Sequence, residues 1–249
     1  MKYYVVSDIH GHFTQFKNSL EQAGYFVDSE PHKLVILGDL FDRGQEAKEE
    51  QRFILELLES ERVILIKGNH EDLFQTMITK DQGVPYKHHV HNGTYETAIQ
   101  LTGMIVKDAI ADNITFCKKS LDTPFYREII PAMRDYFETD QYVFVHGWIP
   151  CNVGKEGYSF MENWRTAGKE EWKKARWYNG MEAAKAVTVE GKTIVCGHWH
   201  ASYGHSKFED KGSEFGTDAD FSPYYGKGII AIDGCTAHSG TVNCIVLED

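Results

Sequence analysis

Short apolar runs alternate with amphipathic stretches through the first third of the chain. Three runs rich in β-branched residues predict buried strands, at Tyr3–Val6, Leu34–Leu37 and Arg62–Ile66. Apolar residues recur at helical spacing after each run and predict helices at His12–Gly24, Glu46–Ser60 and Asp72–Thr79. Strands and helices that alternate in this way imply βαβ crossovers and a parallel sheet.

The pattern changes between Lys80 and Asp140, where helices are predicted at Tyr95–Leu101 and Phe125–Phe137. We expect this span, about residues 80–140, to be a helical insertion over the strand ends, within one domain that covers residues 1–249. Further strands are predicted at Tyr142–Val145, Thr193–Cys196, Ile229–Ile232 and Val242–Leu247. The Trp-rich region before Thr193 predicts packed helices, and Gly204–Tyr225 predicts a loop.

Composition limits the possible partners. The chain has 26 Lys and Arg against 37 Asp and Glu, a formal net charge of −11. This balance argues against broad binding to nucleic acids or to a membrane surface, although a local basic pocket remains compatible with it. Five cysteines without a CxxC pair favour free thiols in a reducing compartment. With no apolar run of transmembrane length and no room for a signal peptide before the first strand, we expect a soluble cytoplasmic protein.

Side chains that bind metals follow five of the predicted strands. They are Asp8 and His10; Asp39 and Asp42 with Arg43; Asn69 and His70; His146; and His198 and His200. Ligands in α/β sheets bind at the carboxyl ends of the strands, so we expect these side chains to converge. Turns seldom require His, and its recurrence therefore favours a metal site. Asp, His and Asn together suit Mn²⁺, Fe²⁺ or Zn²⁺, whereas the cysteines are too few for structural zinc.

A second group of polar residues, His88, His89 and His91, lies in a predicted loop of the insertion. Three neighbouring histidines are compatible with another metal site. The alternative is a loop that borders the main site without holding metal, and we favour this interpretation.

Five motifs occur in order between Asp8 and His198: Asp-x-His-Gly, Gly-Asp-x-x-Asp-Arg-Gly, Gly-Asn-His-Glu, His-Gly and Gly-His. The set resembles the calcineurin-like metallophosphoesterases, and within them the phosphoprotein phosphatase branch, which includes bacterial and phage Ser/Thr phosphatases and diadenosine tetraphosphatases. The resemblance implies an α/β fold with a β-sandwich core of mixed sheets, flanked by helices, and a helical insertion over the active site. It also implies two divalent metal ions, with Mn²⁺ expected first and Fe or Zn as alternatives.

Carried over by position, the resemblance assigns roles to individual residues. One metal would be held by Asp8, His10 and Asp39, and the second by Asp39, Asn69, His146 and His198. His70, oriented by Asp42, would be the general acid, and Arg43 would hold the phosphate beside Asn69. A hydroxide bridging the two ions would then attack phosphorus directly. A second Arg joins the phosphate clamp in the family; Arg176 is the candidate and Arg165 the alternative.

Three stretches depart from the pattern of the branch. His200 completes a Gly-His-Trp-His sequence that resembles the wider superfamily's Gly-His-x-His, in which the second His helps to bind the first metal. Trp148 stands where Gly or Ala is common and predicts a narrower cleft. Asn92–Thr97 resembles an Asn-Gly-Gly-x-x-Thr stretch of diadenosine tetraphosphatases, with one Gly missing.

The motifs therefore predict a metal-dependent phosphatase. We expect a Ser/Thr protein phosphatase first, and a symmetrical diadenosine tetraphosphatase or another small-molecule phosphatase as the alternative. The metal core cannot separate these substrates, because it contacts only the phosphate. A non-catalytic binding protein with the same fold is disfavoured, because every core ligand is present.

Overall fold

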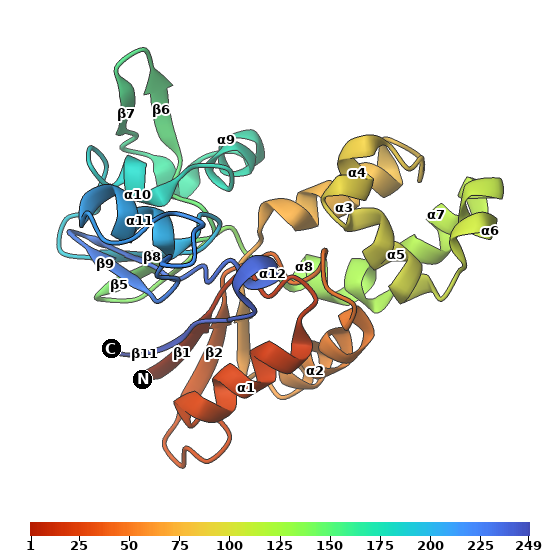
Figure 1. Cartoon of the computed structure of the whole chain (residues 1–249), viewed down its shortest axis with the longest axis horizontal. Helices are drawn as coiled ribbons and strands as arrows, with labels where there is room; N and C mark the ends of the chain where they lie inside the picture. Colours follow the sequence, from red (N-terminus) through yellow and green to blue (C-terminus); the bar gives the residue numbers. More distant parts are fainter.

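Two mixed β-sheets lie face to face at the centre of the computed structural model, which describes residues 1–249 (Figure 1). The first sheet has the order β11-β1-β2-β3 and consists of β11 (Cys244–Glu248), β1 (Lys2–Val6), β2 (His32–Ile36) and β3 (Val63–Leu65). Strands β1, β2 and β3 are parallel, as predicted, and β11 pairs antiparallel with β1.

The second sheet has the order β4-β5-β8-β10-β9. Its strands are β4 (Phe137–Glu138), β5 (Tyr142–Phe144), β8 (Thr193–Cys196), β10 (Ile229–Ala231) and β9 (Tyr224–Gly226). The three central strands β5, β8 and β10 are parallel, and the two edge strands are antiparallel to their neighbours. Each sheet therefore has a parallel centre whose strands end at a common edge.

Alternating side chains divide the apolar residues among three cores. Val5 and Val35 of the first sheet pack against Phe144, Val195 and Ile230 of the second, between the two sheets. Their neighbours along the strands point the other way, under helices. The predicted β-sandwich flanked by helices is thus confirmed.

The first sheet is covered by α1 (Phe13–Ala23), α2 (Ala47–Glu59) and α3 (Asn69–Thr79) together with the insertion. Helix α1 ends as predicted at Gly24, which adopts the left-handed conformation with a φ of 86°. The second sheet is covered by α9 (Lys169–Ala175), α10 (Gly180–Ala183) and α11 (Ala201–Phe208), with the short 3₁₀ helix η2 (Trp164–Thr166). Trp164 and Trp172 are buried there, as the prediction of packed helices required.

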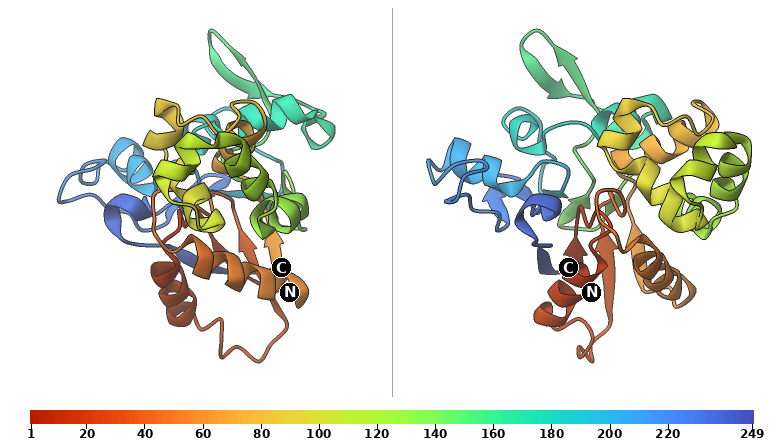
Figure 2. Two further views of the ribbon diagram at one scale, coloured as in Figure 1. Left: turned by 90° about the vertical axis from the view of Figure 1, so that its right-hand side faces the viewer. Right: turned by 45° about the vertical axis from the view of Figure 1, so that its right-hand side comes forward.

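The insertion consists of short helices beside the first sheet (Figure 2). They are α4 (Lys87–His91), α5 (Thr94–Thr102), α6 (Val106–Ala111), α7 (Asn113–Leu121), the π-helix η1 (Phe125–Ile129) and α8 (Ile130–Ala132). Helix α5 contains the predicted helix at Tyr95–Leu101. The prediction of a helix up to Phe137 was wrong at its end, because the backbone becomes extended at Met133 and Phe137 begins β4.

Other boundaries also differ from the predictions. The predicted His-rich loop is helix α4, and the predicted loop at Gly204–Tyr225 includes most of α11 and the start of β9. A hairpin of β6 (Cys151–Gly154) and β7 (Gly157–Phe160) was not predicted; it projects from the body of the molecule in Figures 1 and 2. Trp148 packs in the core of the second sheet, so the prediction that it narrows the cleft was wrong. None of the helices combines the length and the apolar character that a membrane crossing needs.

Candidate active site

The predicted strand-end residues of both sheets meet at one edge of the sandwich. Asp8 and His10 follow β1, Asp39 follows β2, and Asn69 and His70 begin α3 after β3. His146 and His198 follow β5 and β8 of the second sheet. All of these side chains are buried except that of His198, which is half-buried. The site therefore spans the boundary between the sheets.

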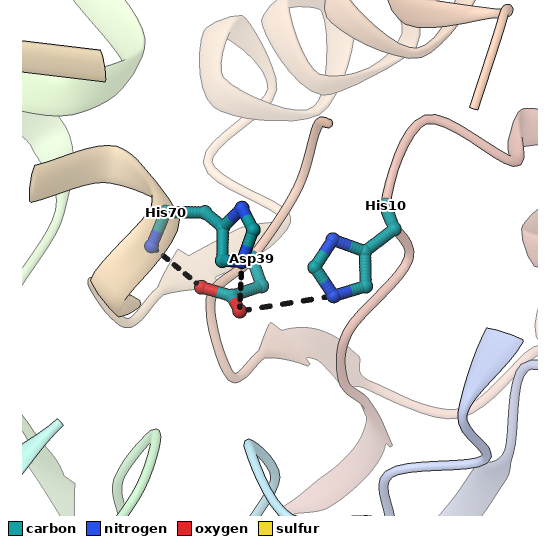
Figure 3. A group of neighbouring side chains, drawn as sticks. All are labelled: His10, Asp39 and His70. Atoms are coloured by element: carbon teal, nitrogen blue, oxygen red, sulfur yellow. Dashed lines mark hydrogen bonds and ion pairs between the residues drawn. The ribbon is translucent and has the colours of Figure 1, made fainter. Parts of the chain in front are cut away.

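Asp39 lies at the centre of this group. Its Oδ2 is 3.8 Å from Nε2 of both His10 and His70, and Figure 3 shows the two rings approaching it from different sides. Its Oδ1 is 3.4 Å from Nε2 of His146 and accepts the backbone N–H of His70 at 3.0 Å. Ligand atoms of Asp39, His146 and His198 form one compact group, and those of Asp39, His10 and His70 form another. The two oxygens of one carboxylate thus face two different sets of imidazoles.

Backbone carbonyls fix which ring nitrogens are free. Nδ1 of His10 donates to the Phe41 carbonyl at 3.0 Å, and Nδ1 of His146 donates to the Leu37 carbonyl at 2.6 Å. Each ring then presents the lone pair of Nε2 to the site. The lone pair of His146 faces Asn69 Oδ1 at 2.7 Å as well as Asp39, so acceptors converge there without a donor. A cation stabilises such an arrangement, and the residues present fit a divalent metal.

Burial keeps these histidines neutral. It lowers the pKa of His10 well below 6.5, lowers that of His146, and lowers that of His198 to about 3. Neutral imidazoles are the form that binds metals. Asp8 is also buried, and this burial, together with the nearby Asp233 and Asp39 carboxylates, raises its pKa well above the usual value. A cation among these carboxylates would offset their mutual repulsion.

The backbone is strained at the same positions. Left-handed φ values are found at Asp8, His10, Asp39, Asp42, Arg43 and His198, which range from 51° to 78°. Such conformations cost roughly 1–3 kcal/mol each for residues with a side chain. These conformations orient the side chains of the site, and favourable interactions elsewhere in the fold must offset their cost.

Helix α3 begins three residues earlier than predicted because Glu71 caps its start. The buried Glu71 carboxylate accepts backbone N–H groups of Gly68 at 2.7 Å, Leu40 at 3.0 Å and Asp39 at 3.2 Å. Burial raises the pKa of Glu71 to about 7. Gly38 completes the junction, since its φ is 87° and a Cβ there would lie 2.5 Å from Gly68 N. The turns after β2 and β3 are thereby held together, by hydrogen bonds to Glu71 and by close backbone packing at Gly38.

His70 is held by the insertion as well as by the sheet. Its Nδ1 donates to Asp42 Oδ2 at 2.6 Å, and the Asp42 carboxylate also accepts the hydroxyls of Thr94 and Thr97, both at 2.7 Å. Burial lowers the pKa of His70, but the Asp39 and Asp42 carboxylates outweigh it and the net shift is upward. The stretch Asn92–Thr97 thus orients Asp42, a role that the motif alone did not indicate.

Arg43 is exposed and lies across two of the imidazoles. Its Nη1 donates to His10 Nε2 at 2.9 Å, and its Nη2 is 3.4 Å from His70 Nε2. The guanidinium is therefore beside the proposed acid and one proposed metal ligand.

The remaining predicted residues have other partners. Arg176 is buried and binds Asp72 at 2.7 Å, the Lys67 carbonyl at 3.2 Å and the Asp135 carboxylate. Arg165 pairs at the surface with Glu138. Nε2 of His200 is 2.7 Å from Glu214 Oε1. A phosphate-binding role for either Arg, and a metal-binding role for His200, stay predictions.

Sequence reasoning missed Asp233. It follows β10 and is buried, and burial raises its pKa to about 6. Its Oδ1 accepts the backbone N–H of Cys235 at 2.7 Å, and its charge interacts with His200, Arg43 and Asp39. The available signal was an Asp-Gly pair directly after an apolar run. Unlike the pairs at the other strand ends, it has no neighbouring His that would indicate a metal site.

Comparison with known proteins identifies the family of the chain. The model of the calcineurin-like phosphoesterases matches residues 1–202. The chain belongs to this family. Proteins of this family are phosphoesterases, and the family depends on a pair of metal ions.

Curated relatives carry related names. The asymmetrical bis(5'-nucleosyl)-tetraphosphatase PrpE of Bacillus velezensis is 30% identical over 132 residues, covering 51% of each chain. The protein of that name from Bacillus subtilis is 29% identical over 162 residues, covering 62% of this chain and 61% of the relative. The chain thus matches about half to three fifths of the length of these relatives. A symmetrical bis(5'-nucleosyl)-tetraphosphatase of Marinomonas sp. is 39% identical over 71 residues, covering 28% of this chain and 24% of that protein.

Solved structures share the fold of this chain. A cold-active protein tyrosine phosphatase has a TM-score of 0.58 at 17% identity, with 99% of this chain and 73% of that chain covered. A putative diadenosine tetraphosphatase has a TM-score of 0.53 at 13% identity, with 99% and 89% covered. At these identities the likeness concerns the fold alone.

Proposed function

We propose that the strand-end site holds two divalent ions that share Asp39. Asp8, His10 and Asp39 would hold one ion, and Asp39, Asn69, His146 and His198 the other. The observation that carries this proposal is that the two Asp39 oxygens face imidazoles of opposite sheets, at 3.8 Å for His10 and 3.4 Å for His146. Oxygen and imidazole ligands suit Mn²⁺, Fe²⁺ or Zn²⁺. The resemblance to the family favours Mn²⁺ among them, with Fe and Zn as alternatives. Such a pair polarises phosphoryl oxygens and supplies a nucleophilic water at neutral pH.

The surrounding residues have separate tasks in this reaction. His70 donates Nδ1–H to Asp42 and keeps Nε2 as the atom that delivers a proton to the leaving oxygen. Its raised pKa favours the protonated imidazole that this task needs. Arg43 would turn from His10 to the substrate and offset charge on the phosphoryl group.

We infer that the substrate is a dinucleoside tetraphosphate. Two tetraphosphatase types occur among the curated relatives. The site is also flanked by exposed aromatic rings: Trp177 is 48% exposed with its ring 5.7 Å from His198, and Phe215 is 53% exposed with its ring 4.5 Å from His200. Such rings can stack on the two nucleobases that every dinucleoside tetraphosphate carries, whereas only some phosphopeptides carry an aromatic side chain near the phosphate.

Phosphoserine and phosphothreonine in proteins, the first expectation from the sequence, become the second candidate. The full set of strand-end motifs matches the phosphoprotein phosphatase branch, and the exposed Arg43 is open to a phosphorylated side chain. The same phosphoryl chemistry would serve both substrates. The choice between them therefore depends on whether the flanking aromatic residues bind a nucleobase.

A direct comparison of the two substrates tests the proposal. The manganese-loaded protein should hydrolyse diadenosine tetraphosphate with a higher kcat/KM than a phosphothreonine peptide. Products identify the bond cleaved, since symmetrical cleavage gives only ADP and asymmetrical cleavage gives ATP and AMP. Trp177→Ala should lower kcat/KM for the dinucleotide by roughly 5- to 150-fold, the cost of one lost base stack.

The control for Trp177 is Phe26→Ala, which removes an aromatic ring of similar exposure, 43%, on the loop after α1. It should leave both substrates unaffected. Hydrolysis of the peptide alone would reject the dinucleotide and favour the second candidate. Hydrolysis of neither, in the presence of bound metal, would contradict both.

A further inference from the structure

A second group of metal-binding side chains lies in the insertion, outside the active site. Asp81 follows the end of α3, and His88 and His89 lie on α4. One ligand atom from each of these residues falls within 4.8 Å of the others. From the sequence we favoured a loop without metal at these histidines, and nothing in the sequence indicated that Asp81 joins them.

The geometry of this Asp81–His88–His89 cluster suits a cation. Nε2 of His89 is 2.7 Å and Nε2 of His88 is 3.8 Å from the same oxygen, Asp81 Oδ2. Ligand atoms bound tetrahedrally at about 2.0–2.2 Å lie roughly 3.3–3.5 Å apart, between these two distances. Only small side-chain movements are needed for all three atoms to bind one ion.

The surroundings preorganise the cluster and leave it accessible. His89 is fully buried, which fixes its ring, whereas the side chain of His88 is 54% exposed. The centroids of the two rings lie 3.9 Å apart, and the Tyr86 ring is nearly parallel to that of His88 at 6.0 Å. Solvent can therefore supply the remaining ligand, a water molecule, on the His88 side.

We propose that Asp81, His88 and His89 form a separate site for a single zinc ion. Two imidazoles and one carboxylate match the ligand preference of Zn²⁺ better than that of Ca²⁺ or Mg²⁺, which prefer oxygen. Three protein ligands and a water make it an open site, independent of the proposed pair of ions at Asp39.

Zinc at this position would join two elements that hold the proposed general acid. The other end of α3 carries His70, and α4 leads through Gly93 into α5, whose Thr94 and Thr97 bind Asp42. A zinc ion between the end of α3 and the start of α4 thus fixes the insertion around the His70–Asp42 pair. Its first effect is on the local stability of residues 80–93.

Metal counting on the full chain tests the proposal. The protein is stripped with a chelator, dialysed against zinc, and its bound zinc is measured by mass spectrometry for wild type, His88→Gln and His91→Gln. His88 is half-exposed, so its replacement should leave the fold intact, and His91 is the matched control on the same helix but outside the cluster. We expect His88→Gln to bind one equivalent less than wild type, and His91→Gln to bind the same amount as wild type.

Hydrogen exchange gives a local measure that does not depend on activity. Zinc should slow amide exchange in residues 80–93 of wild type and His91→Gln by at least tenfold, and leave it unchanged in His88→Gln. Equal zinc counts in wild type and His88→Gln, or an equal loss in both variants, would overturn the proposal. So would zinc-independent exchange across this segment in wild type.

Discussion

Asp42→Asn tests how much the contact between Asp42 and His70 contributes to catalysis. The change replaces a carboxylate by an amide of nearly the same shape, in a buried position between His70, Thr94 and Thr97. The two hydroxyls can rotate to suit the amide, so we expect the fold to be kept. What is lost is the charge that raises the pKa of His70 and holds its Nδ1–H at 2.6 Å.

The size of the effect follows from the type of contact. A hydrogen bond to a charged group contributes about 1.5–3 kcal/mol. If the imidazolium delivers its proton in the rate-limiting step, this loss lowers kcat by roughly 10- to 150-fold. The pKa of His70 also falls without the Asp42 charge. Since the protonated ring is the active form, activity on the alkaline side should decline at a lower pH in the variant than in wild type.

Two aryl phosphates give the assay its control. Phenyl phosphate releases a weakly acidic phenol that needs a proton from His70, whereas p-nitrophenyl phosphate releases a more acidic phenol that can leave as an anion. Asp42→Asn should therefore slow phenyl phosphate hydrolysis much more than p-nitrophenyl phosphate hydrolysis, with metal content unchanged. An equal loss on both substrates, or loss of bound metal, would refute the reasoning.

Three further changes test separate parts of the site. Asp39→Asn removes the shared ligand, so metal content and turnover should both fall sharply while circular dichroism is unchanged; full turnover would exclude the shared role. Asp233→Asn removes a carboxyl whose pKa is about 6 when folded and 3.8 ordinarily. The folded state holds this proton while the unfolded state loses it, so in urea unfolding of metal-free protein the wild type should lose about 3 kcal/mol relative to the variant as pH rises from about 3 to 7; a constant difference would contradict this. Arg176→Met leaves the Asp135 carboxylate unpaired and leaves Lys67 as the one remaining cation at Asp72, so it should cost roughly 3 kcal/mol of stability, against less than about 1 kcal/mol for the surface control Arg165→Met. Similar losses from both would contradict the burial argument.

The sequence was sufficient for the strand ends because local signals agreed there. Apolar runs located β1, β2 and β8, and the polar residues that follow them could only lie at one edge of the sheets. The positions of Asp8, Asp39 and His198 at the strand ends were therefore predicted without knowledge of their contacts.

The features that were missed depend on contacts between distant segments. The start of α3 is fixed by Glu71, which binds backbone N–H groups of Asp39 and Leu40 in the turn after β2. The hairpin β6–β7 is mostly exposed on both faces and so lacks the apolar alternation that reveals a strand. Asp81 is separated from His88 by a turn, and only the folded chain brings them together.

Asp39 and His146 come from different layers of the sandwich, and this has a consequence for how the protein can fail. Asp39 has His10 and His70 beside it in its own layer, but His146 and His198 come from the other layer. Neither half of the fold therefore holds both groups of ligands. A displacement of one sheet relative to the other would abolish hydrolysis before either sheet had unfolded. Enzyme activity should thus report whether the two sheets are packed in their native relative position. Metal ions bound by ligands from both sheets would stabilise that packing.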